Sequence, residues 1–228
     1  MRRFALITLF SIPLFADFFP SAVHTTVESV DQQHIKLQHA FPLNGMSGAV
    51  IHPYGQNAQA ITSYLVQKDK EGSADTIPHS AIDHKELPTI KTPVKRGDQV
   101  IGGYMYQNVL LLAPDAETYA RVTKTYQKNW IHPDLYALFL STEGERGPSR
   151  KNLSEFAKAY QVGLVLIVRN GTAVLLDPVS QKIINRKKME NLPQKGKFPF
   201  FSRLEKIESG WFDTDKGEKD YYKAMEAL

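Results

Sequence analysis

A nearly unbroken hydrophobic run, VGLVLIV at residues 162–168, has the length of a β-strand and dominates the second half of the chain. Asn170-Gly171 follows it, and this pair favours a tight hairpin because both residues tolerate a positive φ. Residues 172–176 are expected to return as a second strand, Asp177-Pro178 to turn, and residues 182–184 to form a third strand. An uninterrupted apolar strand is usually covered on both faces, so the hairpin is predicted to lie in the middle of a sheet.

Helical patterns surround this hairpin. Residues 152–155 (NLSE) combine an N-capping side chain with a glutamate three residues later, which is a helix-start signal. Leu153, Phe156 and Tyr160 then fall on one face of the predicted helix. Three further helices are expected, at residues 114–126, from Pro133 onward and at residues 218–228.

Before residue 113 the chain instead shows short apolar stretches separated by turn signals, a pattern typical of a small barrel or sandwich. Strands are expected at residues 25–30, 34–37, 48–51, 60–66, 101–106 and 109–113, with a loop at 68–75, edge strands or turns at 76–93 and a last strand at 200–207. The sequence therefore predicts an α+β fold. A β-rich barrel-like domain at 17–112 is followed by an α/β domain at 113–228, built round the central hairpin.

The N-terminus has the pattern of a secretory signal. Arg2 and Arg3 precede an apolar stretch at residues 4–15, and Ala16 lies at a suitable cleavage position. The stretch is shorter than the roughly 20 residues that span a bilayer. Residues 1–16 are therefore predicted to be a signal peptide, with cleavage near Ala22 or an uncleaved anchor as alternatives. We expect export to the periplasm or the outer surface, and no transmembrane helix after signal removal.

Composition and charge narrow the classes of partner. The chain has 42% hydrophobic residues, enough for a core, and no cysteine, so an exported domain would be stabilised without disulfides. The formal charge is +4, and it falls to 4 − 2 = +2 without Arg2 and Arg3, which argues against nucleic acid. Basic runs at 186–188 and 195–197 are interpreted as a solvated face, with an anion or membrane-surface site as the alternative.

Several polar groups are candidates for a functional role. They are His79, Asp83, His84 and Glu86 in one loop, His132, the carboxylates Glu143, Glu145, Asp213 and Asp215, and the tripeptide Arg96-Gly97-Asp98. His79 and His84 are five residues apart, which fits neither a helical pair nor a standard zinc spacing. Arg96-Gly97-Asp98 spells an integrin-type adhesive tripeptide, but Gly97-Asp98 is more simply a tight turn before a strand. His132 precedes a helix-opening proline. No catalytic, cofactor-binding or metal-binding residue is assigned, no cofactor is expected, and the protein is not predicted to be an enzyme.

Aromatic residues gather near the end of the chain. They are Phe198, Phe200, Phe201, Trp211 and Phe212. Core filling of the second half is the simpler interpretation. A surface that faces a protein partner is the alternative, because aromatic side chains concentrate at interaction hot spots.

Five blocks of sequence, taken in order, resemble a known family. They are VKRGDQV at 94–100, LLAPD at 111–115 with Tyr119, PDL at 133–135 with FL at 139–140, VGLVLIV at 162–168, and FFSRLE at 200–205. Their order and spacing are similar to the N-terminal domain of the Helicobacter plasminogen-binding protein family (PgbA and PgbB). The resemblance covers residues 27–222, and FFSR is its most specific block.

The resemblance implies an exported or surface protein of a Gram-negative, Campylobacter-like bacterium, with host plasminogen as its protein partner. Members of the family carry a long tail rich in lysine and glutamate, and the kringle domains of plasminogen bind lysine side chains and C-terminal carboxylates. This sequence ends at Leu228 without such a tail, so exposed internal lysines are the expected determinant. The alternative is a periplasmic structural or assembly component of an envelope complex, such as the flagellar motor.

Overall fold

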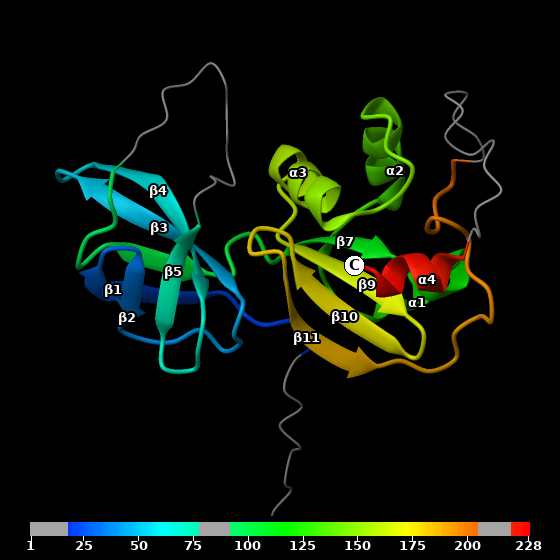
Figure 1. The fold of residues 1–228 in the computed structure, drawn as a ribbon, viewed down its shortest axis with the longest axis horizontal. Coiled ribbons are helices and arrows are strands. Elements are labelled where there is room, and N and C mark those ends of the chain that lie inside the picture. The colour runs from blue at the N-terminus through cyan, green and yellow to red at the C-terminus, as the bar shows by residue number, and fades with distance from the viewer. Residues whose placement is uncertain (1–17, 78–91, 205–219) are drawn as a thin grey trace, which may run out of the picture.

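The computed structural model describes residues 18–77, 92–204 and 220–228, which form two β-sheets and four helices (Figure 1). The first sheet is a closed barrel with strand order β1-β2-β5-β4-β3-β6, and the second has five strands in the order β11-β10-β9-β7-β8. The predicted α+β fold with a barrel-like N-terminal half is thereby confirmed. No helix in these described ranges is long and apolar enough to cross a membrane.

The barrel closes by antiparallel pairing of its first and last strands, Val23 of β1 lying opposite Gly102 of β6. Its strands are β1 (Val23–Asp31), β2 (His34–Leu37), β3 (Ser47–Tyr54), β4 (Ala58–Gln67), β5 (Ser73–Ile77) and β6 (Gln99–Gly102). The ring of Phe41 packs so tightly on β6 that a Cβ added to Gly102 would lie 2.4 Å from its Cε1 atom. Phe41 therefore fills one end of the barrel and requires glycine opposite it.

The second sheet has the predicted hairpin at its centre. Its strands are β7 (Asn108–Leu112), β8 (Asn129–Ile131), β9 (Leu164–Arg169), β10 (Thr172–Asp177) and β11 (Lys182–Lys188). β9 pairs in parallel with β7 on one side and antiparallel with β10 on the other. All of its residues are buried, because hydrophobic clusters cover both faces of the sheet. The expectation of a sheet centre is thus confirmed.

Helices cover both faces of this sheet. They are α1 (Ala116–Thr125), α2 (Pro133–Thr142), α3 (Arg150–Tyr160) and α4 (Tyr221–Glu226). Leu110 and Leu112 of β7 face a cluster formed with α2, α3 and α4. Val109 and Leu111 point to the opposite face, where Val122 of α1 joins a core that continues into the barrel. Two hydrophobic clusters therefore hold the molecule together, and one of them is shared by the two halves.

The first described residues cross from one half to the other. Phe18 accepts a hydrogen bond through its carbonyl oxygen from Asn185 of β11 at 2.9 Å. Phe19 packs edge-on against Tyr126 and Trp130, beside the second sheet. Since β1 then enters the barrel, residues 18 and 19 connect both halves.

Several predicted boundaries were wrong. The helix expected from residue 152 begins one turn earlier, because Ser149 is its N-cap and forms a capping box with Asn152. Residues 73–75 belong to β5 rather than to a loop, and β8 was not predicted. Residues 200–204 form no strand, and residues 205–207 lie outside the described ranges. The strand β7, expected in the barrel half at 17–112, hydrogen bonds with β8 and β9 in the second sheet.

Candidate binding site

The two halves meet at a buried carboxylate. Asp177, at the end of β10, accepts hydrogen bonds from the backbone N–H of Ser47 in β3 at 2.7 Å and from the Tyr106 hydroxyl at 2.6 Å. The backbone N–H groups of Val179 and Ser180 donate to its second oxygen at 2.8 and 2.9 Å. One side chain therefore ties the β10–β11 turn to the barrel.

Opposing influences act on the charge of Asp177. Complete burial is the largest and raises the pKa of its carboxyl above the ordinary value, while hydrogen bonds from Tyr106, Ser180 and Ser47 act to lower it. Burial and the neighbouring carboxylate raise the pKa of Tyr106 well above its usual range. Tyr106 therefore remains a hydrogen-bond donor at every physiological pH.

A cavity of about 440 Å³ opens beside this seam, between the barrel, α3 and the β10–β11 turn. Ile77, Met105, Val162 and Val179 supply apolar parts of its lining. Lys151, Glu155 and Lys158 of α3, together with Ser154, Gln161 and Gln181, supply polar groups. The volume lies within the range of about 300–1,000 Å³ that is usual for small-ligand sites.

Tyr64 of β4 also lines the cavity, and its side chain is only 4% exposed. Its hydroxyl is buried and has no hydrogen-bond partner among the described residues. Burial, and then the influence of Tyr104 in the same lining, raise the pKa of Tyr64 to about 12. The hydroxyl is therefore a protonated donor without an acceptor, which is an unfavourable state for a buried polar group.

Unusual backbone conformations border the same cavity. Met105, Gln161 and Gln181 have positive φ angles of 66°, 54° and 57°, in the left-handed region that disfavours residues with a Cβ. A Cβ added to Gly163 would lie 2.2 Å from the carbonyl oxygen of Met105, so the start of β9 and the β6–β7 loop touch through backbone atoms. The backbone that forms the walls of the cavity is therefore tightly packed at Gly163 and Met105.

Exposed lysines form a second kind of candidate surface. At the end of β11, Lys188 Nζ lies 3.3 Å from Glu190 Oε1, and the two side chains are 82% and 72% exposed. Lys151 and Glu155 on α3 form a looser pair at 3.9 Å, at the edge of the cavity. Exposed pairs of this kind are weak, so both groups remain free to exchange partners.

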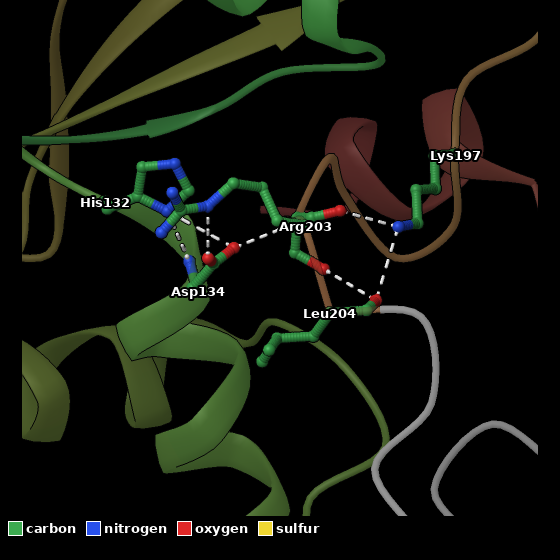
Figure 2. Close-up of polar contacts among 6 residues, drawn as sticks. His132, Asp134, Lys197, Arg203 and Leu204 are labelled. Atoms are coloured by element: carbon green, nitrogen blue, oxygen red, sulfur yellow. Dashed lines mark hydrogen bonds and ion pairs between the residues drawn. The ribbon is translucent and has the colours of Figure 1, made fainter.

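Polar contacts at the start of α2 hold the FFSR segment, residues 200–203, against this helix (Figure 2). Arg203 donates through its backbone N–H and its Nε to the two carboxylate oxygens of Asp134, each at 2.8 Å. Lys197 Nζ donates to the carbonyl oxygens of Ser202 at 2.6 Å and Leu204 at 3.4 Å. The block therefore closes a loop onto α2, in a structural role.

His132 belongs to this cluster as the N-cap of α2. Its Nδ1 accepts from the backbone N–H of Asp134 at 3.2 Å, and burial lowers the pKa of the imidazole. A neutral ring suits this acceptor role. The interpretation of His132 as a residue that opens a helix is confirmed.

The tripeptide Arg96-Gly97-Asp98 is a turn whose carboxylate points inward. Asp98 is 2% exposed, accepts from the backbone N–H of Lys95 at 2.8 Å and lies 2.6 Å from Nδ1 of His52. Gly97 has a φ of 90°, which the turn requires. The turn interpretation is confirmed, and the buried carboxylate is unsuited to an adhesive contact.

The other sequence candidates are not brought together in the described ranges. The loop group His79, Asp83, His84 and Glu86 lies outside them, as do Asp213, Asp215, Trp211 and Phe212. Glu143 and Glu145 follow α2. Among the described residues no three His, Cys, Asp or Glu side chains lie close enough together to hold a metal ion. Phe200 is buried against Tyr136 and fills the core, whereas Phe201, which packs on Tyr119, and Phe198 are half-buried.

Tyr64 and Asp177 were not among the sequence candidates. Asp177-Pro178 gives only a turn signal, and the separation of 130 residues from Ser47 leaves no local sign of their contact. Tyr64 occupies an ordinary strand position, where a tyrosine is expected from β-propensity alone. Its missing partner is a property of the assembled fold.

A closed barrel joined to a mixed five-stranded sheet, with a lined cavity between them and exposed lysines at the surface, defines a small α+β module. The chain belongs to the family described as "Plasminogen-binding protein pgbA N-terminal", whose model matches residues 22–228.

Two relatives named plasminogen-binding protein PgbA come from Helicobacter pylori strains J99 and 26695. They are 29% and 28% identical to this chain over 153 residues, which are 65% of this chain and 33% of each relative. The matched region thus spans about a third of the length of these curated relatives. No solved structure matches the chain.

Proposed function

We propose that this chain acts as an exported, non-enzymatic binding protein of the bacterial envelope or surface, and that it binds plasminogen through exposed lysine. The family name and the names of both relatives support a binding role. The charged and apolar N-terminal pattern at residues 1–16 supports export.

The observation that carries the proposal is the Lys188–Glu190 pair. A free lysine presents an ammonium group and a carboxylate, and this pair presents the same two groups from an ordered strand end. Both side chains are far more exposed than buried, so little must be rearranged for a lysine-binding site to take the ammonium group. Lys187 is less available, because its Nζ lies 3.1 Å from the Tyr126 hydroxyl.

Binding of purified residues 17–228 to plasminogen, with and without a free lysine analogue, tests the proposal. We expect saturable binding that the analogue abolishes. Lys188→Gln should weaken binding about tenfold or more, whereas Lys124→Gln, an equal charge change at another exposed lysine, should leave it unchanged. Absence of binding at micromolar concentration would overturn the plasminogen assignment.

Lys188→Arg separates lysine recognition from simple charge attraction. A guanidinium group keeps the charge but has a different shape and donor geometry from an ammonium group. We expect Lys188→Arg to bind as weakly as Lys188→Gln. Full binding by the arginine variant, with loss at raised salt, would instead indicate non-specific electrostatic attraction.

The export part of the proposal has its own test. Cell fractionation of the full chain should place it outside the cytoplasm, and N-terminal sequencing should give a mature start near residue 17 or near residue 23. An intact N-terminus in the cytoplasmic fraction would contradict export. Stable recovery within a large envelope complex, without plasminogen binding, would favour the structural alternative.

A further inference from the structure

We propose that the cavity between the barrel and α3 is a binding site for a small organic anion, composed of an apolar body and one carboxylate. This site is separate from the Lys188–Glu190 pair, and its test does not involve plasminogen. The proposal rests on the cavity, on one unsatisfied buried donor and on the charges of α3.

The Tyr64 hydroxyl is the first argument. Buried polar groups in folded proteins nearly always have a hydrogen-bond partner, and an unpaired donor destabilises the fold. Tyr64 keeps its proton and lines the cavity, yet it donates to no described residue. A ligand oxygen that displaces the side chains covering this hydroxyl would satisfy the donor, and the hydrogen bond gained would offset that rearrangement.

Charge decides the kind of acceptor. Lys151 and Lys158 lie in the lining with a single carboxylate, that of Glu155. Lys151 lies 3.9 Å from Glu155, whereas Lys158 has no partner in the part of the chain that the structure describes. One positive charge therefore remains uncompensated beside the cavity, which favours an anion over a cation or a neutral ligand.

The remaining lining decides the body of the ligand. Ile77, Met105, Val162 and Val179 offer side chains that gain by covering hydrocarbon rather than water. The Met105–Gly163 contact fixes the backbone of the walls, so the rearrangement on binding is confined to side chains. A medium-length carboxylate with an aliphatic chain or apolar side chains fits these features.

Titration calorimetry with full mature protein tests the proposal, using octanoate, octylammonium and 1-octanol as probes of equal chain length. We expect octanoate to bind at least about tenfold more tightly than either of the others, because only octanoate offers an acceptor with negative charge. An acetylated leucyl-leucine dipeptide adds a peptide carboxylate. Tighter binding of the dipeptide would identify a peptide C-terminus as the source, and tighter binding of octanoate a fatty acid.

Two variants connect the binding to the named groups. Tyr64→Phe should leave the melting temperature of the free protein unchanged or higher, since no bond is lost, while octanoate affinity falls about five- to tenfold. Lys158→Gln should remove most of the preference for octanoate over 1-octanol. Tyr222→Phe is the control, because its hydroxyl donates to the Pro193 carbonyl at 2.6 Å, remote from the cavity, so it should lower stability without changing affinity.

The proposal fails if neither carboxylate binds, or if octylammonium binds as tightly as octanoate. It also fails if Tyr64→Phe lowers the melting temperature as Tyr222→Phe does while octanoate affinity is unaffected. That result would mean that the Tyr64 hydroxyl stabilises the folded protein and does not contact the ligand. None of these outcomes depends on whether plasminogen binds.

Discussion

The hydroxyl of Tyr106 donates a hydrogen bond of 2.6 Å to the carboxylate of Asp177, across 71 residues of sequence. Tyr106 lies just before β7, and Asp177 ends β10. With the backbone of Ser47 bound to the same carboxylate oxygen, this contact links the barrel to the second sheet. The carboxylate is completely buried, so its loss cannot be repaired by water.

Replacing Asp177 by asparagine should therefore destabilise the protein. An amide nitrogen would face donors, leaving at least one backbone N–H or the Tyr106 hydroxyl unpaired. We expect a loss of about 2–4 kcal/mol in the free energy of unfolding, measured by urea denaturation. Asp31→Asn, at an exposed position of β1, should change stability by less than about 0.5 kcal/mol. Equal stability of the two variants would refute the linking role of Asp177.

The Asp134–Arg203 contact predicts a pH dependence. Burial alone would raise the pKa of Asp134, but hydrogen bonds from Arg203 act in the opposite direction, and the pKa lies below its ordinary value. A carboxyl with a lowered pKa in the folded state adds stability above its unfolded pKa of about 4 and loses it at more acidic pH. Asp134→Asn should thus cost about 1 kcal/mol at pH 7. That difference from wild type should shrink below pH 4. A difference that stays constant from pH 7 to pH 3 would exclude this linkage.

Gln161 ends α3 in the left-handed conformation, with φ of 54° and ψ of 42°. Glycine adopts this conformation without the steric cost of a Cβ, and it is the usual residue at this position. Gln161→Gly should raise the free energy of unfolding by about 0.5–1 kcal/mol. Gln127→Gly, at a loop residue whose φ is not positive, should be neutral or destabilising in the same thermal melts. If both variants lose stability, the strain at residue 161 is negligible.

Gly102 at the barrel end and Gly147 in the α2–α3 loop make a matched pair of glycine substitutions. In Gly102→Ala the new Cβ would meet the Phe41 ring at 2.4 Å, so the ring or the strand must move. We expect a loss of about 1–3 kcal/mol. Nothing lies within 4 Å of a Cβ at Gly147, and its φ is not in the left-handed region, so Gly147→Ala should be nearly neutral. Chemical denaturation compares the two, and comparable losses would show that Phe41 packs loosely.

Local patterns predict the central hairpin and the helix that His132 opens, because a strand run, a turn pair or a cap is contained within a few residues. The first helix was expected from Pro114, but Asp115 is its N-cap and it begins at Ala116. The start of α3 was misplaced because Ser149 and Asn152 are both good caps, and only their mutual hydrogen bonds decide between them. The strand β5 was missed because polar residues dominate its short sequence.

The candidate site was largely beyond prediction. Its lining comes from the barrel, the β6–β7 loop, α3 and the β10–β11 turn. These segments lie far apart in the sequence, from Ser47 to Gln181. A sequence shows that Tyr64 has a hydroxyl, but only the packed fold shows that no acceptor reaches it. The exposed lysines were expected as a class, whereas the particular pairing of Lys188 with Glu190 follows from the end of β11.

The contact between Phe18 and Asn185 has a consequence for the order in which the protein is assembled. The two residues are 167 positions apart, so the docking site for the first described residues does not exist until β11 has been synthesised. Until then Phe18 and Phe19 are apolar and uncovered. Chaperones that hold unfolded chains would therefore find an apolar target at Phe18 and Phe19 for as long as synthesis of the chain lasts.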